Sequence, residues 1–214
     1  MARTAGSEGG KTEAAIREAA VALIARFGYE AMSMRRLAAE VGVQAAALYR
    51  YFPTKEDLLF ELMREHMQLL MASWLAARPA SADPPERLAA FVGHHIRFHV
   101  ARRHATHVSN MELRSLSRDR LTQVLRLRTG YEKELRAILR QGAENGDFLV
   151  EDAGLAAMAI IQMITGVIVW FRPDERLSVG EVEDTYLAMT LRLVGAAPSR
   201  EQPHVRSFDE VRTR

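Results

Sequence analysis

Residues 28–58 combine small, amide, hydroxyl and cationic side chains at helical spacing. Gly42 and Val43 form a short turn between two stretches with the pattern of short helices, which is the helix-turn-helix arrangement. Leu48 and Phe52 lie four residues apart, so they predict the inward face of the second helix. The opposite face then presents Gln44, Ala45, Ala46, Tyr49 and Arg50.

These side chains have the chemistry that reads double-stranded DNA in the major groove. Gln44 can form two hydrogen bonds with adenine, the small alanines allow close approach and contact thymine methyl groups, and Arg50 can bond guanine or a phosphate. The hydroxyl groups of Ser33 and Tyr49 and the ammonium group of Lys55 are placed for phosphate oxygens. The same spacing also fits an αα-corner in an ordinary helical bundle. From the residues alone, both interpretations remain open.

A second group of candidate residues consists of five histidines. Two of them are four residues apart on a predicted helix, which is ligand spacing for zinc or nickel. No carboxylate shares their register, and Glu112 is the nearest. A metal-sensing regulator is therefore kept as an alternative to histidines that are partly exposed or line a pocket. The cluster comprises His94, His95, His99, His104 and His107.

Motifs typical of enzymes are missing. Residues 6–12 resemble a phosphate-binding loop, but the first glycine would fall at Ala5 and no strand precedes it. The chain has no cysteine, which excludes disulfides, thiolate metal sites and cysteine nucleophiles. We therefore expect no enzymatic activity and no cofactor.

Composition indicates a globular protein with a modestly basic N-terminal part. Of the 214 residues, 48% are hydrophobic and 26% charged, which excludes disorder for most of the chain. The formal net charge is +2, with +3 in residues 1–55 (eight Lys/Arg, five Glu) and −1 in the remainder (21 Lys/Arg, 22 Asp/Glu). This distribution permits phosphate contact without proving it. The polar N-terminus lacks a secretory signal, so a cytoplasmic location is expected.

The elements that must position these residues are helices, and the predicted fold class is all-α with about nine helices. Apolar residues recur with 3.6-residue periodicity, and no strand pattern is found. The first stripe comprises Ile16, Ala19, Ala20, Leu23 and Phe27, and Gly28 ends it. Ser33 is the predicted N-cap of a second helix that ends at Gly42. Later helices are expected at about 44–52, 54–78, 86–102, 105–115, 118–145, 152–171 and 179–195.

Residues 28–58 resemble the DNA-binding domain of the tetracycline-repressor (TetR) family of bacterial transcription regulators. The match spans about fifty residues: Gly28, Ser33-Met34-Arg35, Leu37-Ala38, Gly42-Val43, Leu48-Tyr49, Tyr51-Phe52 and Lys55-Glu56-Asp57-Leu58. The resemblance implies a ligand-responsive repressor in which Ser33, Tyr49 and Lys55 hold phosphates. It also implies that Gln44, Ala45 and Ala46 face bases, with Arg35 and Tyr51 near the DNA. Gln44 stands where the family usually has a capping Ser, and Tyr51 stands where His is common. These differences concern which operator sequence is recognised, not whether the protein binds DNA.

The stretch 153–171 contains no charged residue and is long enough to span a bilayer. Gln162, Thr165 and two glycines interrupt it, so we predict a buried interface helix and no membrane contact. The resemblance implies that the helices at about 152–171 and 179–195 pair with their copies in a homodimer. Because one recognition helix covers only a few base pairs, a dimer on a palindromic operator is also expected on physical grounds.

Residues 112–195 resemble, less specifically, the acyl-CoA-responsive members of that family. The matching stretches are Glu112–Leu116, Tyr131-Glu132, Gly142, Gly146-Asp147-Phe148, Gly166 and Trp170–Pro173. The resemblance implies a small-molecule effector in a tunnel with arginines for the phosphates of the coenzyme. The alternative is a regulator of an efflux gene that responds to a drug-like ligand. The expected effector residues are Glu112, Arg114, Arg118, Arg128, Met163, Trp170 and Phe171.

The predicted organisation follows from these assignments. It has a flexible arm (1–10), a DNA-binding domain (11–55), an effector-binding and dimerisation domain (56–197) and a frayed tail (198–214).

Overall fold

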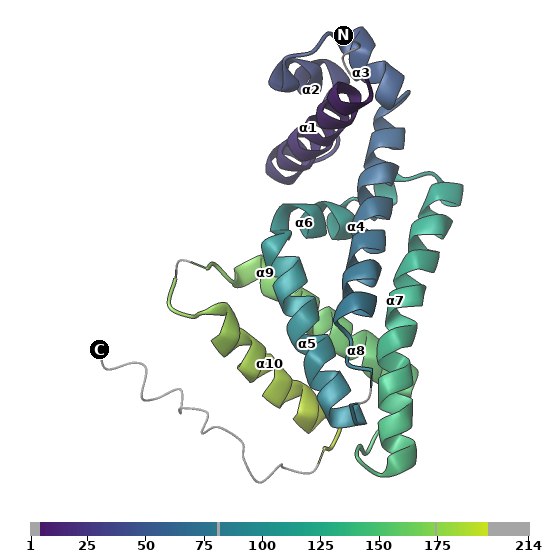
Figure 1. Cartoon of the computed structure of the whole chain (residues 1–214), viewed down its shortest axis with the longest axis vertical. Helices are drawn as coiled ribbons and strands as arrows, with labels where there is room; N and C mark the ends of the chain where they lie inside the picture. The colour runs from purple at the N-terminus through teal and green to yellow at the C-terminus, as the bar shows by residue number, and fades with distance from the viewer. Residues whose placement is uncertain (1–4, 81, 174, 197–214) are drawn as a thin grey trace. The chain divides into compact units, whose positions relative to one another are not determined.

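The computed structural model describes residues 5–80, 82–173 and 175–196, and in this part of the chain every regular element is a helix, as the sequence predicted (Figure 1). The predicted tail at 198–214 lies outside the described residues. The helices are α1 (Ala5–Phe27), α2 (Met34–Val41), α3 (Ala45–Tyr51), α4 (Lys55–Ala77), α5 (Pro84–Ala101), α6 (Arg103–Met111), the 3₁₀ helix η1 (Leu113–Ser115), α7 (Arg118–Asn145), α8 (Ala153–Thr165), α9 (Val167–Trp170) and α10 (Val179–Leu193).

The chain divides into two compact units. The first comprises Met1–Leu75 and Phe98–Tyr131, and the second comprises Ala76–Arg97 and Glu132–Arg214. The first unit thus combines the predicted DNA-binding segment with most of α4, with α6 and with the first half of α7. The compact units therefore do not separate at the predicted boundary near residue 55.

The core of the first unit is built from one face of each of its first helices. Helix α1 contributes Ile16, Ala20, Leu23 and Ile24, and α2 contributes Met34, Leu37 and Ala38. Phe27 was predicted to lie inward, and this is wrong: its ring is 39% exposed, with the Arg36 guanidinium 4.0 Å from its centroid. Helix α1 begins at Ala5, so residues 5–10 of the expected flexible arm are helical, whereas residues 1–4 lie outside the described residues.

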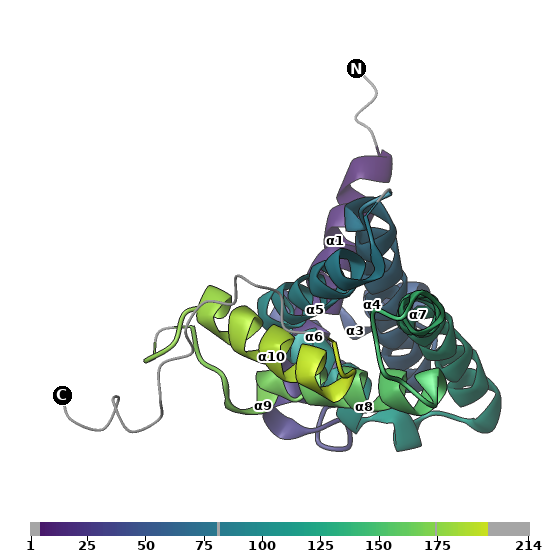
Figure 2. The ribbon, with the colours of Figure 1, turned by 90° about the horizontal axis from the view of Figure 1, so that it is seen from below.

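The apolar stretch predicted at 152–171 forms two helices, α8 and α9, separated at Gly166. Asp152 caps α8 by accepting hydrogen bonds from the backbone N–H of Gly154 and Leu155, at 2.8 and 3.0 Å. Gly166 itself keeps right-handed helical angles, with a φ of −57°. Helix α10 packs beside α8 in the second unit (Figure 2).

By length and composition, Ala153–Trp170 could cross a membrane, but only 28% of it is buried within the chain. The predicted burial of this stretch is therefore not provided by the chain itself. Leu155 and Val169 expose 62% and 73% of their surface.

Three carboxylates tie α1–α4 to the segment 112–120 of the same unit. Glu112 accepts a hydrogen bond from the backbone N–H of Tyr29 at 3.1 Å. Glu56 accepts one from the backbone N–H of Ser117 at 2.8 Å, and Asp57 forms an ion pair with Arg120. Because Glu56 and Asp57 lie in the first turn of α4, these contacts fix the helix that directly follows α3.

Two glycines on α7 allow a matched test of packing. At Gly142 a side chain would overlap the ring of Phe148, which is buried, so Gly142→Ala should lower the free energy of unfolding by about 1–3 kcal/mol. At Gly130 the new methyl group would make ordinary contact with Met71, so Gly130→Ala should raise it by about 0.5–1 kcal/mol. Urea unfolding of both variants measures this, and effects of the same sign would contradict the packing described here.

The contacts of Glu56 predict a pH dependence of stability. The hydrogen bond from Ser117 and the charge of Arg120 lower the pKa of Glu56 below its ordinary value of 4.5. A carboxylate with a lowered pKa stabilises the fold above its unfolded pKa, and this contribution is lost as pH falls through the folded pKa. Glu56→Gln should therefore be less stable than wild type at pH 7, and this difference should shrink when the pH is lowered to about 3.

Denaturant unfolding at both pH values measures this difference, with Glu40→Gln as the control because Glu40 is an exposed carboxylate on α2. A deficit of Glu56→Gln that is unchanged at low pH would show that the charge of Glu56 does not contribute.

Candidate functional site

Helix α3 has an apolar face in the core and a polar face in solvent. Leu48 and Phe52 are buried, as their spacing predicted. Ala45 and Tyr51, which were expected at DNA, are partly buried and pack against the same core. Tyr49 is 48% exposed. The exposed residues of this face are Gln44, Ala46, Tyr49 and Arg50, and all four belong to the set predicted from the sequence.

The turn before α3 has a defined geometry. The Ser33 hydroxyl caps α2 by accepting a hydrogen bond from the backbone N–H of Arg36 at 3.2 Å. Gly42 ends α2 with a φ of 76°, a left-handed conformation that favours glycine. Val43 then donates its backbone N–H to the carbonyl of Ala38 at 3.0 Å. Because both ends of α2 are fixed, the direction in which α3 leaves the turn is fixed as well.

Cationic side chains surround this turn. Arg35 is exposed on α2. The Lys55 ammonium group lies 4.0 Å from the centroid of the Tyr29 ring and donates to the carbonyl of Glu30 at 3.3 Å. Burial, followed by the charges of Glu56 and Glu30, raises the pKa of Tyr29, so its hydroxyl stays protonated and neutral. Lys55 is thus held beside α3 while keeping donors for a further partner.

Two residues that shape this site, the exposed Arg36 and the buried Tyr29, were not predicted from the sequence. Arg36 is exposed next to Arg35, and its guanidinium covers the Phe27 ring. Tyr29 positions Lys55 through its ring. The signal for Arg36 was available, because two consecutive arginines on a helix whose apolar face is complete must both face solvent. The role of Tyr29 depends on a contact over 26 residues, which the local pattern does not contain.

The seven expected effector residues are divided between the two units. In the first unit, Glu112 holds Tyr29 and Ser115 through its carboxylate, and Arg114 and Arg118 are exposed. Arg128 is partly buried and donates from Nη2 to the Ser109 carbonyl at 2.7 Å and to Asn110 Oδ1 at 2.9 Å.

The remaining three expected residues lie in the second unit. Trp170 stacks on Tyr186 and donates its indole N–H to the Tyr186 hydroxyl at 3.2 Å. Phe171 is buried and Met163 is partly buried. Trp170 is therefore a surface aromatic residue with a stacked partner, whereas Phe171 belongs to the core.

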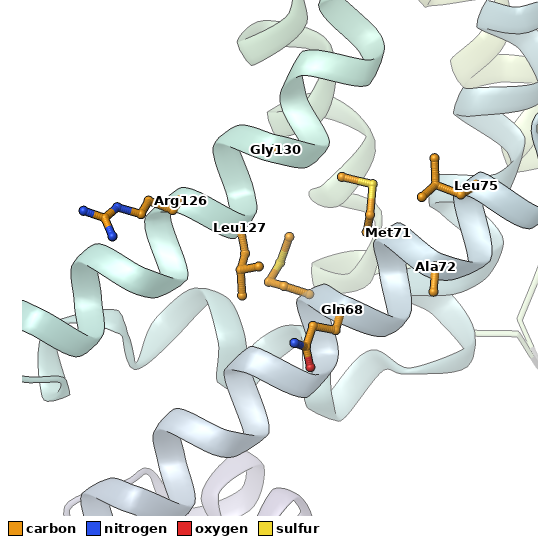
Figure 3. A pocket seen from close by; sticks show the side chains of 8 residues that line it. Gln68, Met71, Ala72, Leu75, Arg126, Leu127 and Gly130 are labelled. Atoms are coloured by element: carbon orange, nitrogen blue, oxygen red, sulfur yellow. The ribbon is translucent and has the colours of Figure 1, made fainter.

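An open, mostly apolar groove of about 290 Å³ lies between α4 and α7 of the first unit (Figure 3). Its walls include Met71 and Leu75 of α4 and Leu127 of α7, and Arg126 extends away from it toward solvent. None of the seven expected effector residues lines this groove.

The histidine cluster is split by its surroundings. His95 Nε2 lies 2.8 Å from the hydroxyl of Thr165, whereas His99 packs edge-on against His66. His104 and His107 are exposed. Over the described residues, no group of three or more His, Cys, Asp or Glu side chains is arranged to hold a metal ion.

Two family models match the chain. The model described as bacterial regulatory proteins of the tetR family matches residues 16–62, which contain α2, α3 and the turn between them. The model described as the tetracyclin repressor-like C-terminal domain matches residues 81–194. Together they cover most of the described chain.

Individual relatives agree with these models. A tetR-family regulatory protein from Rhodococcus RHA1 superposes with a TM-score of 0.84 at 31% identity, covering 88% of this chain and 99% of that one. The structure of AibR in complex with isovaleryl coenzyme A and operator DNA gives a TM-score of 0.77 at 28% identity, covering 87% and 100%. The fatty acid metabolism regulator protein of Bacillus subtilis is 26% identical over 177 residues, covering 80% of this chain and 90% of the relative.

The matches extend over both parts of the chain, and the DNA-binding match falls on the exposed α3 surface. The chain therefore belongs to the TetR family of bacterial transcription regulators, a family of regulatory proteins rather than enzymes.

Proposed function

We propose that this protein is a cytoplasmic, homodimeric repressor that binds a palindromic operator through α3 and leaves it when an acyl-CoA thioester binds. The exposed face of α3 carries this proposal. Gln44 and Ala46 are available for base edges, and Tyr49 and Arg50 for base edges or phosphates. The relative AibR, whose structure contains operator DNA and isovaleryl coenzyme A, supports both the DNA and the class of effector.

The proposed contacts divide into two classes. Ser33, Arg35, Tyr49 and Lys55 would contact phosphates and position the protein, without reading sequence. Gln44 and Ala46 would contact bases, with Ala45 behind them against the core. Tyr51 packs against the core, so it would support the helix and approach the backbone of DNA only with its edge.

A second copy is the proposed cover for the apolar surface of α8–α10. Leu155, Met158 and Val169 are exposed there, together with Met189 and Leu193 of α10. Soluble proteins rarely leave a contiguous apolar face uncovered, and such faces mark interaction sites. Because two-fold symmetry pairs each face with its own copy, a dimer would bury both at once and place two α3 helices on one duplex.

DNA binding by the full-length protein tests the proposed function. The protein should bind the DNA upstream of its own gene in fluorescence anisotropy, and added isovaleryl-CoA should reduce the bound fraction. Gln44→Ala should relax the preference at one operator position, which corresponds to a loss of about 1–3 kcal/mol of discrimination. Tyr49→Phe should weaken binding to all sequences equally, and Lys55→Ala should reduce the slope of log affinity against log salt by about one.

Arg140→Ala serves as the control, because Arg140 is exposed on α7 outside the α1–α3 bundle and should leave all three quantities unchanged. If Gln44→Ala lowered affinity uniformly across operator variants, Gln44 would not read a base. If the wild-type protein bound no upstream DNA, the proposed function itself would be wrong.

The dimer predicts a specific effect of charge on α8. Leu155→Glu places a carboxylate in the proposed interface, where it would be buried without a partner. It should therefore raise the dimer dissociation constant at least about tenfold in analytical ultracentrifugation. Leu125→Glu is the matched control, since Leu125 is an exposed leucine on α7 outside α8–α10. A dimer that withstands Leu155→Glu would exclude this face as the interface.

A further inference from the structure

A second open cavity, of about 660 Å³, lies in the first unit, and its size falls in the range of small-molecule sites. Helices α1 and α4 form two of its walls. The corner between α5 and α6, residues 100–105, forms the third. The lining residues that carry charge or can carry it are Arg17, Glu18, Glu65, His66, Arg102, Arg103 and His104.

The charges on the walls of this cavity are unevenly distributed. On the α1–α4 side, Arg17 forms ion pairs with Glu13 at 2.7 Å and with Glu65 at 3.1 Å, so its charge is neutralised. Glu18 remains as an exposed carboxylate at the rim. The α5–α6 corner contributes Arg102, Arg103 and His104 in succession and no carboxylate. The Arg102 guanidinium lies 5.3 Å from the centroid of the Phe98 ring, which holds it beside the cavity.

His66 is the buried polar group of the cavity wall. It is 5% exposed, and its Nδ1 has no hydrogen-bond partner among the described residues. Its ring packs against Phe98 and His99, with centroids 5.5 and 5.7 Å away. Burial, together with the charges of His99, Arg102 and Arg128, lowers the pKa of His66 to about 3, so the imidazole is neutral at pH 7. A neutral imidazole carries one ring proton, which it can donate to a ligand oxygen.

Arg128 of α7 adds a positive charge close to His66. Its Nη2 donates to Ser109 and Asn110, whereas its Nε is buried without a partner in the described part of the chain. No carboxylate among the described residues lies within ion-pair distance of it, and burial lowers its pKa. Buried charges are normally paired, so a partly buried guanidinium without a carboxylate favours an anion from outside the chain.

We propose that this cavity is an effector site for a small molecule that carries an oxyanion, a carboxylate or a phosphate, which His66 and Arg102 contact and Arg128 attracts. This inference rests on the proposed ligand-responsive function and names the chemical group that the ligand presents. Since α1 forms one wall, a ligand in the cavity contacts a helix of the DNA-binding bundle directly. Occupancy can then shift the α1–α3 bundle by differential affinity for two positions of α1.

Isothermal titration calorimetry on the full-length protein tests the site with four probes. Isovaleryl-CoA carries phosphates and an acyl group, coenzyme A carries phosphates without the acyl group, isovalerate carries a carboxylate, and isovaleramide is its uncharged analogue. At least one anionic probe should bind, and isovaleramide should not. Binding of coenzyme A identifies a phosphate as the recognised group, whereas binding of isovalerate without coenzyme A identifies a carboxylate.

Variants locate the binding site. Arg102→Met should weaken the anionic probe about ten- to a hundredfold, the expected effect of losing a charge-assisted contact, whereas Arg128→Met, which removes a nearby charge without a direct contact, should weaken it less. Arg140→Met is the control on α7, with a side chain that is 72% exposed, and it should change nothing. His66→Asn keeps a donor without the imidazole and should weaken the probe while leaving the folded state intact, as judged by circular dichroism.

Two results would overturn the inference: no anionic probe binds, or a probe binds with an affinity that Arg102→Met and His66→Asn leave unchanged. The same preparations are tested for binding to upstream DNA. If the wild-type protein binds DNA but none of the anionic probes, only the effector site proposed here is wrong. If it binds no upstream DNA, the proposed function is wrong.

Discussion

The exposed face of α3 depends on the burial of Leu48 and Phe52 on its other side. Helix α3 has seven residues, and isolated helices of that length are not stable in water. Its conformation must therefore come from packing against the core that Ile16, Leu37 and Leu58 complete. Once those two side chains are buried, the 3.6-residue repeat leaves Gln44, Ala46, Tyr49 and Arg50 no orientation other than toward solvent. The surface that defines the function is thus a consequence of core packing.

The same bundle is held from the other direction by segment 112–120. Glu112, Glu56 and Asp57 make four contacts with three residues, Tyr29, Ser117 and Arg120, and two of these contacts use backbone N–H groups. A structural change in α6 or α7 would be transmitted through these contacts to α4 and hence to α3. In the proposed effector cavity, α1 provides a second and more direct route. Both routes use contacts inside one compact unit, where side chains have few alternative positions.

Local patterns predicted the helices, most of their ends and the face of α3. Ser33 and Gly42 were predicted as helix ends, and the structure confirms both, because caps depend on neighbouring residues only. Phe27 shows the limit of this approach. Its spacing placed it in the core, but Ile24 is the last buried residue of α1, and Arg36 from the next helix covers the ring of Phe27. The break at Gly166 was missed, although Thr165 and the glycines were recognised as interruptions of the apolar stretch.

Prediction was weakest for the effector residues, since these depend on contacts between distant segments. Glu112 was assigned to a ligand from its place in a matching stretch, yet its carboxylate holds the backbone of Tyr29, 83 residues away. His66 and Arg102 were not singled out, because nothing in their local sequence indicates that they share a cavity. Both residues line the same cavity, and the α5–α6 corner of that cavity contributes no carboxylate.

The contacts of segment 112–120 also limit which substitutions related proteins can accept at these positions. Two of them use main-chain donors, at Tyr29 and Ser117, which any residue other than proline supplies. The backbone donor is therefore kept when Ser117 is replaced by any residue other than proline, although the contribution of its hydroxyl group is lost, whereas the acceptors Glu56 and Glu112 are required. In a related protein, the acidic residues at the positions of Glu56 and Glu112 therefore indicate whether these contacts are present. A proline at the position of Tyr29 or Ser117 would remove the N–H donor and the hydrogen bond with it.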